Sequence, residues 1–283
     1  MIVDFAIEPL AEDALLLRFG DGIDIDVNAR VHAAAHAIRA AKLAGVVDIV
    51  PAYATLLVRF ELSRWFDNEG ARSFDRLAAD LRATIKTNRG APDGGDSCQS
   101  AGPGGSETPP PYPTLSPEPE AVRERGLVVG APDGRPAPRD IRAMVEIPVC
   151  YGGEFGEDLD AIAARADISI DEVIARHTQA EYTVAMLGFA PGFPYLLGLD
   201  PALHVPRRAN PRTRVPAGSV AIGGAQTGIY PRELPGGWNL IGRTPLALFD
   251  ADREPPCLLA PGDRVRFRAI DADEFRRLAE RGA

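Results

Sequence analysis

The segment from Thr87 to Asp140 has a composition that folded domains rarely have. Its central part, "NRGAPDGGDSCQSAGPGGSETPPPYPTLSPEPE", is rich in Gly, Pro, Ser and acidic residues and has almost no regular pattern of aliphatic residues. Such a segment buries too little apolar surface to offset the entropy that is lost when it becomes ordered. The sequence therefore predicts two folded domains, at residues 1–86 and 141–283, joined by a flexible linker or insertion at residues 87–140.

The first domain alternates between strand-like and helix-like segments. The strands are expected at residues 14–20, 46–50 and 54–62, where apolar side chains dominate. The helices are expected at residues 27–45 and 70–85, where apolar side chains recur at helical spacing. The order β-α-β-β-α predicts a small split βαβ domain of the ferredoxin-like type, so that the fold class is α+β.

The second domain combines one predicted helix with many short strands. A strand at residues 144–153 precedes a helix whose start is marked by Ser169 and Glu172, the two residues of a capping box. Beyond Leu187, short β-rich pieces such as "VPAGSVAIGG", "TGIYP" and "GGWNLIGRTPLALFD" alternate with Pro/Gly turns. Closely spaced turns between short strands predict a compact β-barrel, flanked by helices, that ends in a short polar helix.

The charge of the chain excludes one large class of partner. Asp and Glu number 40 against 31 Lys and Arg, which gives a formal net charge of −9. A nucleic-acid binder needs a positive surface to neutralise phosphates, so no nucleic acid is expected. The longest apolar runs are about a strand in length, so no membrane partner is expected. The N-terminal "MIVDFAIEPLAED" lacks the basic start and long apolar run of a secretion signal, and we expect a cytoplasmic protein.

Familiar nucleotide and metal motifs are missing from the sequence. The chain has no G-x-x-x-x-G-K-[ST], and the prolines of "GFAPGFPYLLG" would interrupt the helix that a dinucleotide fingerprint requires. A nucleotide would therefore be bound through another architecture or together with a partner. His32 and His36 stand four residues apart but have no third ligand nearby in the sequence, and no metal site is predicted.

The residues that carry chemistry concentrate between His177 and Thr244. Several arginines recur beside prolines in "VPRRANPRTRVPAG", and guanidinium forks suit carboxylate or phosphate groups. Each glycine, proline or aromatic residue of this block also has a structural explanation in the corners and core of a barrel. Arginines clustered on rigid loops are harder to explain by packing, so the block predicts a pocket for a small anionic molecule.

The same block resembles a known family. "GFAPGFPYL", then "PAGSVAIGG" followed by "QTGIYP", and then "PGGWNLIGRTP" occur in this order. They are typical of the family of 5-oxoprolinase B subunits, which is also named allophanate hydrolase subunit 1 or KipI-like and corresponds to carboxyltransferase subdomains C and D. The similarity covers nearly everything except the linker. It implies an N-terminal α/β domain followed by a cyclophilin-like β-barrel, in agreement with the patterns above.

The resemblance also implies an activity. Members of the family take part in an ATP-dependent 5-oxoprolinase, which opens the lactam of 5-oxo-L-proline to L-glutamate. The enzyme is active only as a complex of the B subunit with the C subunit, which is a second barrel, and a separate A subunit. ATP, expected together with Mg, would be a co-substrate, because a lactam is a poor electrophile and phosphorylation of its amide oxygen would create a leaving group.

Two other functions stay open as alternatives. Relatives are named for the inhibition of a sensor histidine kinase, and others are carboxyltransferase components of a urea carboxylase or allophanate hydrolase system. The dense set of Arg, Gln, Thr and Trp favours small-ligand chemistry over protein docking. This sequence contains no biotin-attachment region, which argues against carboxyl transfer by this chain alone.

The resemblance implies a set of pocket residues by motif match. None is assigned a catalytic role, and the set is not divided between residues that contact ATP and residues that contact substrate. The thirteen candidates are His177, Tyr182, Phe189, Gly192, Tyr195, Arg207, Arg212, Ser219, Gln226, Thr227, Tyr230, Trp238 and Arg243.

Overall fold

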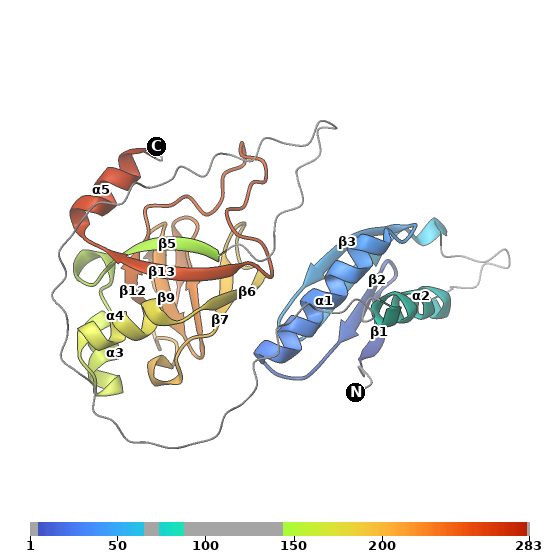
Figure 1. The fold of residues 1–283 in the computed structure, drawn as a ribbon, viewed down its shortest axis with the longest axis horizontal. Helices are drawn as coiled ribbons and strands as arrows, with labels where there is room; N and C mark the ends of the chain where they lie inside the picture. Colours follow the sequence, from blue (N-terminus) through green and yellow to red (C-terminus); the bar gives the residue numbers. More distant parts are fainter. Residues whose placement is uncertain (1–4, 65–73, 88–143, 282–283) are drawn as a thin grey trace, which may run out of the picture. The chain divides into compact units, whose positions relative to one another are not determined.

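A computed structural model of the chain describes residues 5–64, 74–87 and 144–281. These residues form an N-terminal α/β domain and a C-terminal β-barrel domain (Figure 1). The predicted α+β class is confirmed. Of the predicted linker, residues 88–140 lie outside the described residues.

The described part of the N-terminal domain consists of four strands and two α-helices. In chain order they are β1 (Ala6–Ala11), β2 (Ala14–Arg18), α1 (Ile25–Ala41), β3 (Val46–Pro51), β4 (Thr55–Phe60), the short 3₁₀ helix η1 (Leu62–Arg64) and α2 (Phe74–Thr87). The sheet order is β1-β2-β4-β3, and every neighbouring pair is antiparallel. Consequently β2 and β3 are parallel to each other, with β4 between them and α1 connecting them, which confirms the split βαβ unit.

Strand β1 was not expected from the sequence. It pairs with β2 at the edge of the sheet, most of its residues are exposed, and it contains Pro9 beside a register shift. A proline removes a ladder hydrogen bond and is tolerated on an edge strand, but it also disrupts the alternation by which strands are recognised. The strand therefore leaves little signal in the sequence.

Helix α1 supplies much of the core of this domain. Its N-cap, Asp24, accepts hydrogen bonds from two backbone N–H groups of the first turn, at 2.9 Å each. The buried face includes Val31 and Ile38 and packs on the sheet. The helix ends at Ala41, earlier than the sequence pattern indicates, because Lys42 adopts a left-handed conformation with φ of +47°.

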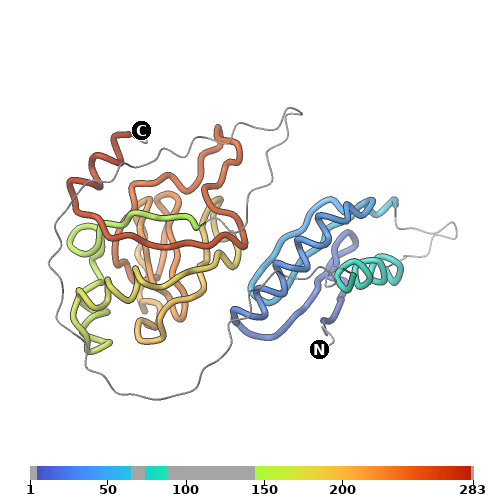
Figure 2. The backbone as a smooth tube through the Cα atoms, viewed as in Figure 1, coloured from blue at the N-terminus to red at the C-terminus, as the bar shows by residue number. Residues whose placement is uncertain are grey.

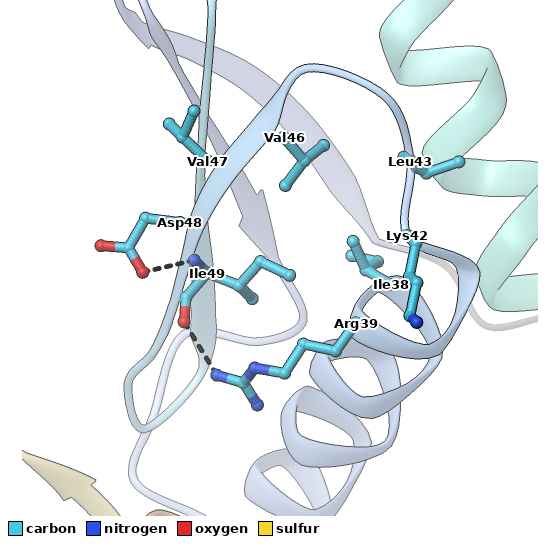
Figure 3. A pocket seen from close by; sticks show the side chains of 8 residues that line it. All are labelled: Ile38, Arg39, Lys42, Leu43, Val46, Val47, Asp48 and Ile49. Atoms are coloured by element: carbon cyan, nitrogen blue, oxygen red, sulfur yellow. Dashed lines mark hydrogen bonds between the residues drawn. The ribbon is translucent and has the colours of Figure 1, made fainter. Parts of the chain in front are cut away.

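Strand β3 forms the other edge of the sheet, and side chains cap part of it. An open pocket of about 260 Å³ lies between the end of α1 and β3 (Figure 3). There Arg39 Nη2 donates to the backbone carbonyl of Ile49 at 2.9 Å, and the Ile49 N–H donates to Asp48 Oδ1 at 2.8 Å. Open edge strands invite pairing with other chains. We therefore interpret Arg39 and Asp48 as a block against such pairing.

Removal of this cap is expected to increase self-association. The double variant Arg39→Ala/Asp48→Ala leaves the net charge unchanged but exposes both backbone groups of Ile49. Light scattering over a concentration series should give a higher mean mass for this variant than for the wild type. The matched control is the charge-neutral pair Asp75→Ala/Lys86→Ala on α2, and equal masses for the two variants would contradict the interpretation.

The barrel domain contains nine strands and three α-helices within the described residues. In chain order the elements are β5 (Met144–Tyr151), η3 (Gly153–Phe155), α3 (Leu159–Ala166), α4 (Ile170–Gln179), β6 (Tyr182–Leu187), β7 (Pro194–Leu197), η4 (Pro201–Leu203), β8 (Arg212–Val215), β9 (Ser219–Gly223), β10 (Gln226–Ile229), β11 (Leu234–Gly236), β12 (Asn239–Arg243), β13 (Arg264–Ile270) and α5 (Ala272–Arg281). The predicted N-cap is present at α4, where the Glu172 N–H donates to Ser169 Oγ at 3.1 Å. The second half of the predicted capping box is not formed, because the Glu172 carboxylate accepts from Arg176 Nε at 2.7 Å. No helix in the described ranges has the length and apolar character needed to cross a bilayer.

Seven of these strands close into a barrel, whose backbone path is traced in Figure 2. The order around it is β10-β7-β6-β13-β5-β12-β9. Strands β5 and β13 come from opposite ends of the domain sequence and are parallel, in continuous register from Met144 with Arg264 to Cys150 with Ile270. The remaining neighbours are antiparallel. Outside the barrel, β8 and β11 form a two-stranded ribbon.

The barrel strands carry hydrophobic cores on two faces. Alternate residues of a strand point to opposite faces. In β9, Val220 and Ile222 belong to the core inside the barrel, whereas Ala221 belongs to a second cluster on the outer face. That outer cluster comprises Ala190, Phe193, Val215, Ala221, Tyr230, Trp238 and Leu240. Burial on both faces explains why this segment of the sequence is continuously apolar.

Candidate functional site

A pocket of about 230 Å³ opens beside the outer cluster of the barrel. The loop between β6 and β7, the segment that precedes β8, and the end of β11 supply its walls. Its lining residues are Phe189, Phe193, Tyr195, Arg207, Arg208, Pro211, Tyr230, Pro235, Gly236, Gly237 and Trp238. The pocket therefore combines largely aromatic walls with two arginines.

The best-defined feature of this pocket is an arginine over a tryptophan. The indole of Trp238 lies so close to the backbone of β9 that a Cβ atom on Gly223 would stand 2.6 Å from its ring. On this ring lies the guanidinium of Arg207, with its central carbon 5.5 Å from the ring centroid. A guanidinium on an aromatic face can still direct its N–H groups toward a carboxylate. We call this arrangement the Arg207–Trp238 platform.

Hydrogen bonds on both sides of Arg207 hold the platform in place. Asn239 Nδ2 donates to the carbonyl of Pro206 at 3.0 Å, and the Arg208 N–H donates to the carbonyl of Gly237 at 2.7 Å. These two hydrogen bonds join the residues on either side of Arg207 to the residues on either side of Trp238. Among the described residues, no side-chain hydrogen bond or ion pair occupies the Arg207 guanidinium itself, so its donors are available to a ligand.

A buried carboxylate, Asp158, also holds the segment that carries Arg207. Asp158, which precedes α3, accepts from Arg208 Nη1 at 2.7 Å and from Arg212 Nη1 and Nη2 at 2.8 and 3.0 Å. It also accepts from the Leu240 N–H at 2.7 Å, while its own N–H donates to the Leu240 carbonyl at 2.9 Å. Asp158 is only 6% exposed. One carboxylate thus ties β12 and the arginine-bearing segment together.

The ionised form of Asp158 is stabilised by these contacts. Burial alone would raise the pKa of this carboxyl group. The hydrogen bonds from Arg212 and the Leu240 N–H, together with the charges of Arg212 and Arg208, lower the pKa by more than burial raises it. The net result is a pKa below the usual value for Asp. Asp158 is therefore ionised at neutral pH, opposite the charged Arg208 and Arg212.

Aromatic rings in edge-to-face contact form the remaining walls. The ring of Phe193 contacts Trp238 at a centroid distance of 5.7 Å and an angle of 89°, and it contacts Tyr230 at 5.2 Å and 90°. Tyr195 contacts Trp238 at 5.8 Å. Such contacts are preferred by aromatic pairs and restrict each ring. Phe193 thus stands at the centre of a rigid apolar wall.

Phe189 differs from its aromatic neighbours because its backbone is strained. The Ala190 N–H donates to the Gly188 carbonyl at 2.7 Å, which makes Phe189 the central residue of a γ-turn, and its φ is +66°. The γ-turn with positive φ is the rare form. For a residue other than glycine, such a conformation costs about 1–3 kcal/mol. The side chain is nevertheless 61% exposed, at the margin of the pocket.

Among the described residues, the only charged side chains that line the pocket are arginines. Its lining contains no Asp, Glu, His, Lys, Ser or Cys among the described residues. Burial raises the pKa of Tyr230, so that its hydroxyl group is neutral near pH 7. The charge of the pocket therefore comes from Arg207 and from Arg208, whose charge is shared with Asp158. This arrangement suits a small, flat anion with an apolar body.

The structure brings five of the thirteen predicted residues to this pocket. They are Phe189, Tyr195, Arg207, Tyr230 and Trp238. The other eight lie elsewhere in the barrel domain, and three of these eight belong to one buried hydrogen-bond network. The pocket also includes residues that were not predicted, mainly Phe193, Arg208 and the run from Pro235 to Gly237.

The buried network is centred on His177 in the last turn of α4. His177 Nδ1 lies 2.8 Å from the Tyr151 hydroxyl, and Nε2 lies 3.1 Å from Thr227 Oγ1. Thr227 Oγ1 donates to the Ala221 carbonyl at 3.1 Å, and the Tyr182 hydroxyl donates to the His177 carbonyl at 2.9 Å. Since the Thr227 proton is used for Ala221, Nε2 carries the imidazole proton and Nδ1 accepts from Tyr151.

This environment keeps His177 neutral. Desolvation in the fully buried site lowers the pKa of His177 to about 3. The imidazole also stacks on Phe267 of β13, with ring centroids 4.4 Å apart. Each polar atom of the ring has a partner, and the ring contacts the barrel core. In this structure His177, Tyr182 and Thr227 join α4 to the barrel strands.

The low pKa of His177 predicts a loss of stability at mildly acidic pH. In the unfolded chain the imidazole takes up a proton near pH 6.5, whereas in the native state it does so only near pH 3. Between these values the unfolded state binds the extra proton, so the free energy of unfolding falls by about 1.4 kcal/mol per pH unit as the pH falls. From pH 7.5 to pH 5 this contribution amounts to about 2 kcal/mol.

Urea unfolding of the wild type and of His177→Gln at pH 7.5 and at pH 5 measures this contribution. The variant is expected to be less stable at pH 7.5 but to lack the His177 share of the pH dependence. The difference between the two slopes removes the effect of other titrating groups. Identical slopes would contradict the assignment of a buried neutral imidazole.

Five further candidates lie apart from both the pocket and the network. Arg212 is engaged by Asp158 and by Glu157, and Arg243 Nε donates to the Ala217 carbonyl at 2.7 Å. Gly192 has φ of +80° and packs against the segment at residues 248–249, where a Cβ atom would stand 2.7 Å from the nearest atom. The remaining two, Ser219 and Gln226, are buried and are the first residues of β9 and β10, respectively.

The residues that sequence reasoning missed fall into two classes. Phe193 and Pro235 to Gly237 stand within the quoted motifs "GFAPGFPYL" and "PGGWNLIGRTP", so the motif boundaries could have identified them. Asp158 stands outside the block from His177 to Thr244, and only its long-range contacts distinguish it from other acids. Where the structure describes the chain, no group of three His, Cys, Asp or Glu side chains is placed to hold a metal ion.

Comparison with known proteins identifies the family. The family model for the carboxyltransferase domain, subdomain C and D, matches residues 5–98 and 127–259. The B subunit of 5-oxoprolinase from Bacillus subtilis (strain 168) is 39% identical over 278 residues, which cover 97% of this chain and 97% of that protein. The chain belongs to the family of 5-oxoprolinase B subunits. The resemblance drawn from the sequence motifs is thereby confirmed.

Other similar proteins match only part of this chain or are longer than it. The B subunit of 5-oxoprolinase from Escherichia coli O157:H7 is 58% identical over 124 residues, covering 44% of this chain and 57% of that protein. The crystal structure of TTHA0988 covers 92% of this chain at 36% identity, with a TM-score of 0.63. This chain spans 40% of the length of the TTHA0988 chain. The family model leaves residues 99–126 unmatched, and these lie within the predicted linker.

Proposed function

We propose that this chain is the B subunit of an ATP-dependent 5-oxoprolinase, which opens 5-oxo-L-proline to L-glutamate together with an A subunit and a C subunit, the second barrel of the complex. The observation that carries the proposal is the 39% identity with the B subunit of a 5-oxoprolinase over nearly the whole length of both chains. The pocket supports it, because its chemistry suits the substrate. 5-Oxoproline is a flat five-membered ring with one carboxylate.

In the proposed complex, the pocket binds the ring substrate. The carboxylate would receive charge-assisted hydrogen bonds from Arg207, whose guanidinium has no side-chain partner among the described residues. The apolar ring faces would contact the wall formed by Phe193 and Tyr230. At about 230 Å³ the pocket is smaller than the usual range for drug-sized ligands, so it suits the lactam better than a nucleoside triphosphate.

The reaction needs groups that this pocket does not contain. The amide oxygen of the lactam would attack the γ-phosphorus of ATP, with loss of ADP. Water then adds to the ring carbon, the C–N bond breaks, and the nitrogen takes a proton; a second water releases phosphate and leaves glutamate. The pocket lining has no carboxylate or imidazole to move these protons. We therefore assign substrate binding to this chain and place ATP, its Mg and the acid–base groups with the partner subunits.

Reconstitution tests the proposed function. The full chain is mixed with its A-subunit and C-subunit partners, ATP, Mg and 5-oxo-L-proline, and released glutamate and phosphate are measured. The expected result is ATP-dependent release of glutamate that exceeds the level given by the two partners without this chain. Release at the level of that two-partner control would refute the assignment.

Arg207→Ala is expected to weaken substrate binding in the reconstituted complex. Loss of a charge-assisted hydrogen bond of about 1.5–3 kcal/mol corresponds to about a 10–100-fold increase in KM for 5-oxo-L-proline. The matched control is Arg214→Ala, because Arg214 lies seven residues further along, is 81% exposed and does not line the pocket. Steady-state kinetics should show the increase for Arg207→Ala alone. Equal KM values for the two variants would remove Arg207 from the site.

A further inference from the structure

Phe189 occupies a position where a phenylalanine is unfavourable on two grounds. The residue lies at the centre of the rare γ-turn, with φ of +66°, a conformation that glycine adopts without strain. Its ring is 61% exposed, so it contributes little to the hydrophobic core. Neither backbone geometry nor burial explains the presence of a large apolar side chain here.

The location of the ring suggests what it contacts instead. Phe189 lines the same pocket as the Arg207–Trp238 platform. Phe193 is in ring contact with both Phe189, at 5.4 Å, and Trp238, at 5.7 Å, so it lies between them. Among the described residues, Phe189 also contacts Tyr230 edge-to-face at 6.4 Å. These contacts restrict the ring on one side and leave the rest of its surface open.

The turn itself is well anchored. The Phe193 N–H donates to the Ala190 carbonyl at 3.0 Å, and the Gly188 N–H donates to the Phe193 carbonyl at 3.2 Å. The loop also packs closely against residues 248–249 through Gly192. The surrounding structure thus holds Phe189 in its strained conformation and sets the ring at the margin of the pocket. Strain of this kind is concentrated at ligand-binding positions.

We infer that Phe189 is a specificity-determining residue, which packs on the apolar face of a ring-shaped carboxylic acid whose carboxylate binds Arg207. The inference rests on the proposed function and adds a criterion for substrate choice. A small acid without a ring would bind Arg207 but would leave Phe189 without a contact. A cyclic acid would use both groups. The pocket therefore selects cyclic over open-chain carboxylates of similar charge.

Variants of Phe189 separate ligand contact from packing. Phe189→Gly removes the ring and relieves the positive-φ strain, whereas Phe189→Ala removes the ring and keeps the strain. We expect the melting temperature of Phe189→Gly to equal or exceed that of the wild type and to exceed that of Phe189→Ala. A melting temperature of Phe189→Gly below that of the wild type would make Phe189 a packing residue and overturn the inference.

In the reconstituted complex, Phe189→Gly should raise KM for 5-oxo-L-proline about tenfold or more, with kcat changed far less. Phe189→Leu, which keeps much of the apolar volume, should restore most of the affinity. The matched control is Ile170→Ala, since Ile170 is an exposed apolar residue of α4 that does not line the pocket. A wild-type KM for Phe189→Gly would overturn the inference. If that variant instead assembled poorly with its partners, Phe189 would be a contact between subunits, and the inference would equally be wrong.

A binding measurement on the full chain alone keeps this test independent of the proposed function. Cyclopentanecarboxylate and acetate are titrated by calorimetry into the wild type and into Phe189→Gly. The wild type should prefer the cyclic acid, and Phe189→Gly should lose that preference. Failure of the complex to release glutamate would refute the proposed function alone. Equal affinity of the wild type for the two acids, or binding of neither, would refute the role of Phe189.

Discussion

The candidate site depends on one buried carboxylate. Asp158 accepts hydrogen bonds from Arg208, from Arg212 and from the backbone of Leu240, and it is held by the barrel through a reciprocal backbone bond. Loss of a buried ionic partner leaves uncompensated charge and is far more costly than loss of a surface pair. The contacts of Asp158 with Arg208 and Arg212 therefore attach the segment that carries Arg207 to the barrel. Their removal would leave a buried charge unless the surrounding side chains repacked.

The pocket lies outside the barrel because the interior is already full. Aliphatic and aromatic side chains of seven strands fill the barrel core, and the His177 network joins α4 to it. The aromatic cluster lies on the outer face of the same strands. At Gly223, for example, the Trp238 ring packs directly on the strand backbone. The barrel thus provides a rigid support, and loops bring the polar and strained groups. This division between scaffold and loops is common in binding proteins.

Sequence reasoning predicted local features well and long-range features poorly. The N-cap at Ser169 and the succession of short strands were recognisable because both depend on neighbouring residues. The parallel pairing of β5 with β13 joins segments more than a hundred residues apart, and no local pattern encodes it. Similarly, a histidine in a ligand-rich block can be a pocket residue or a buried one. The two cases are distinguished only in the structure, where His177 is hydrogen-bonded to Tyr151 and Thr227.

The central claim is that the Arg207–Trp238 platform receives a carboxylate, and the chain provides its own reporter. Its two tryptophans are Trp65 and Trp238, so Trp65→Phe leaves Trp238 as the sole indole fluorophore. Titration of this variant with 5-oxo-L-proline should give a saturable change in Trp238 emission, and the same titration with 2-pyrrolidinone, the lactam without the carboxylate, should not. A response of equal size and midpoint to both compounds, or to neither, would contradict the account.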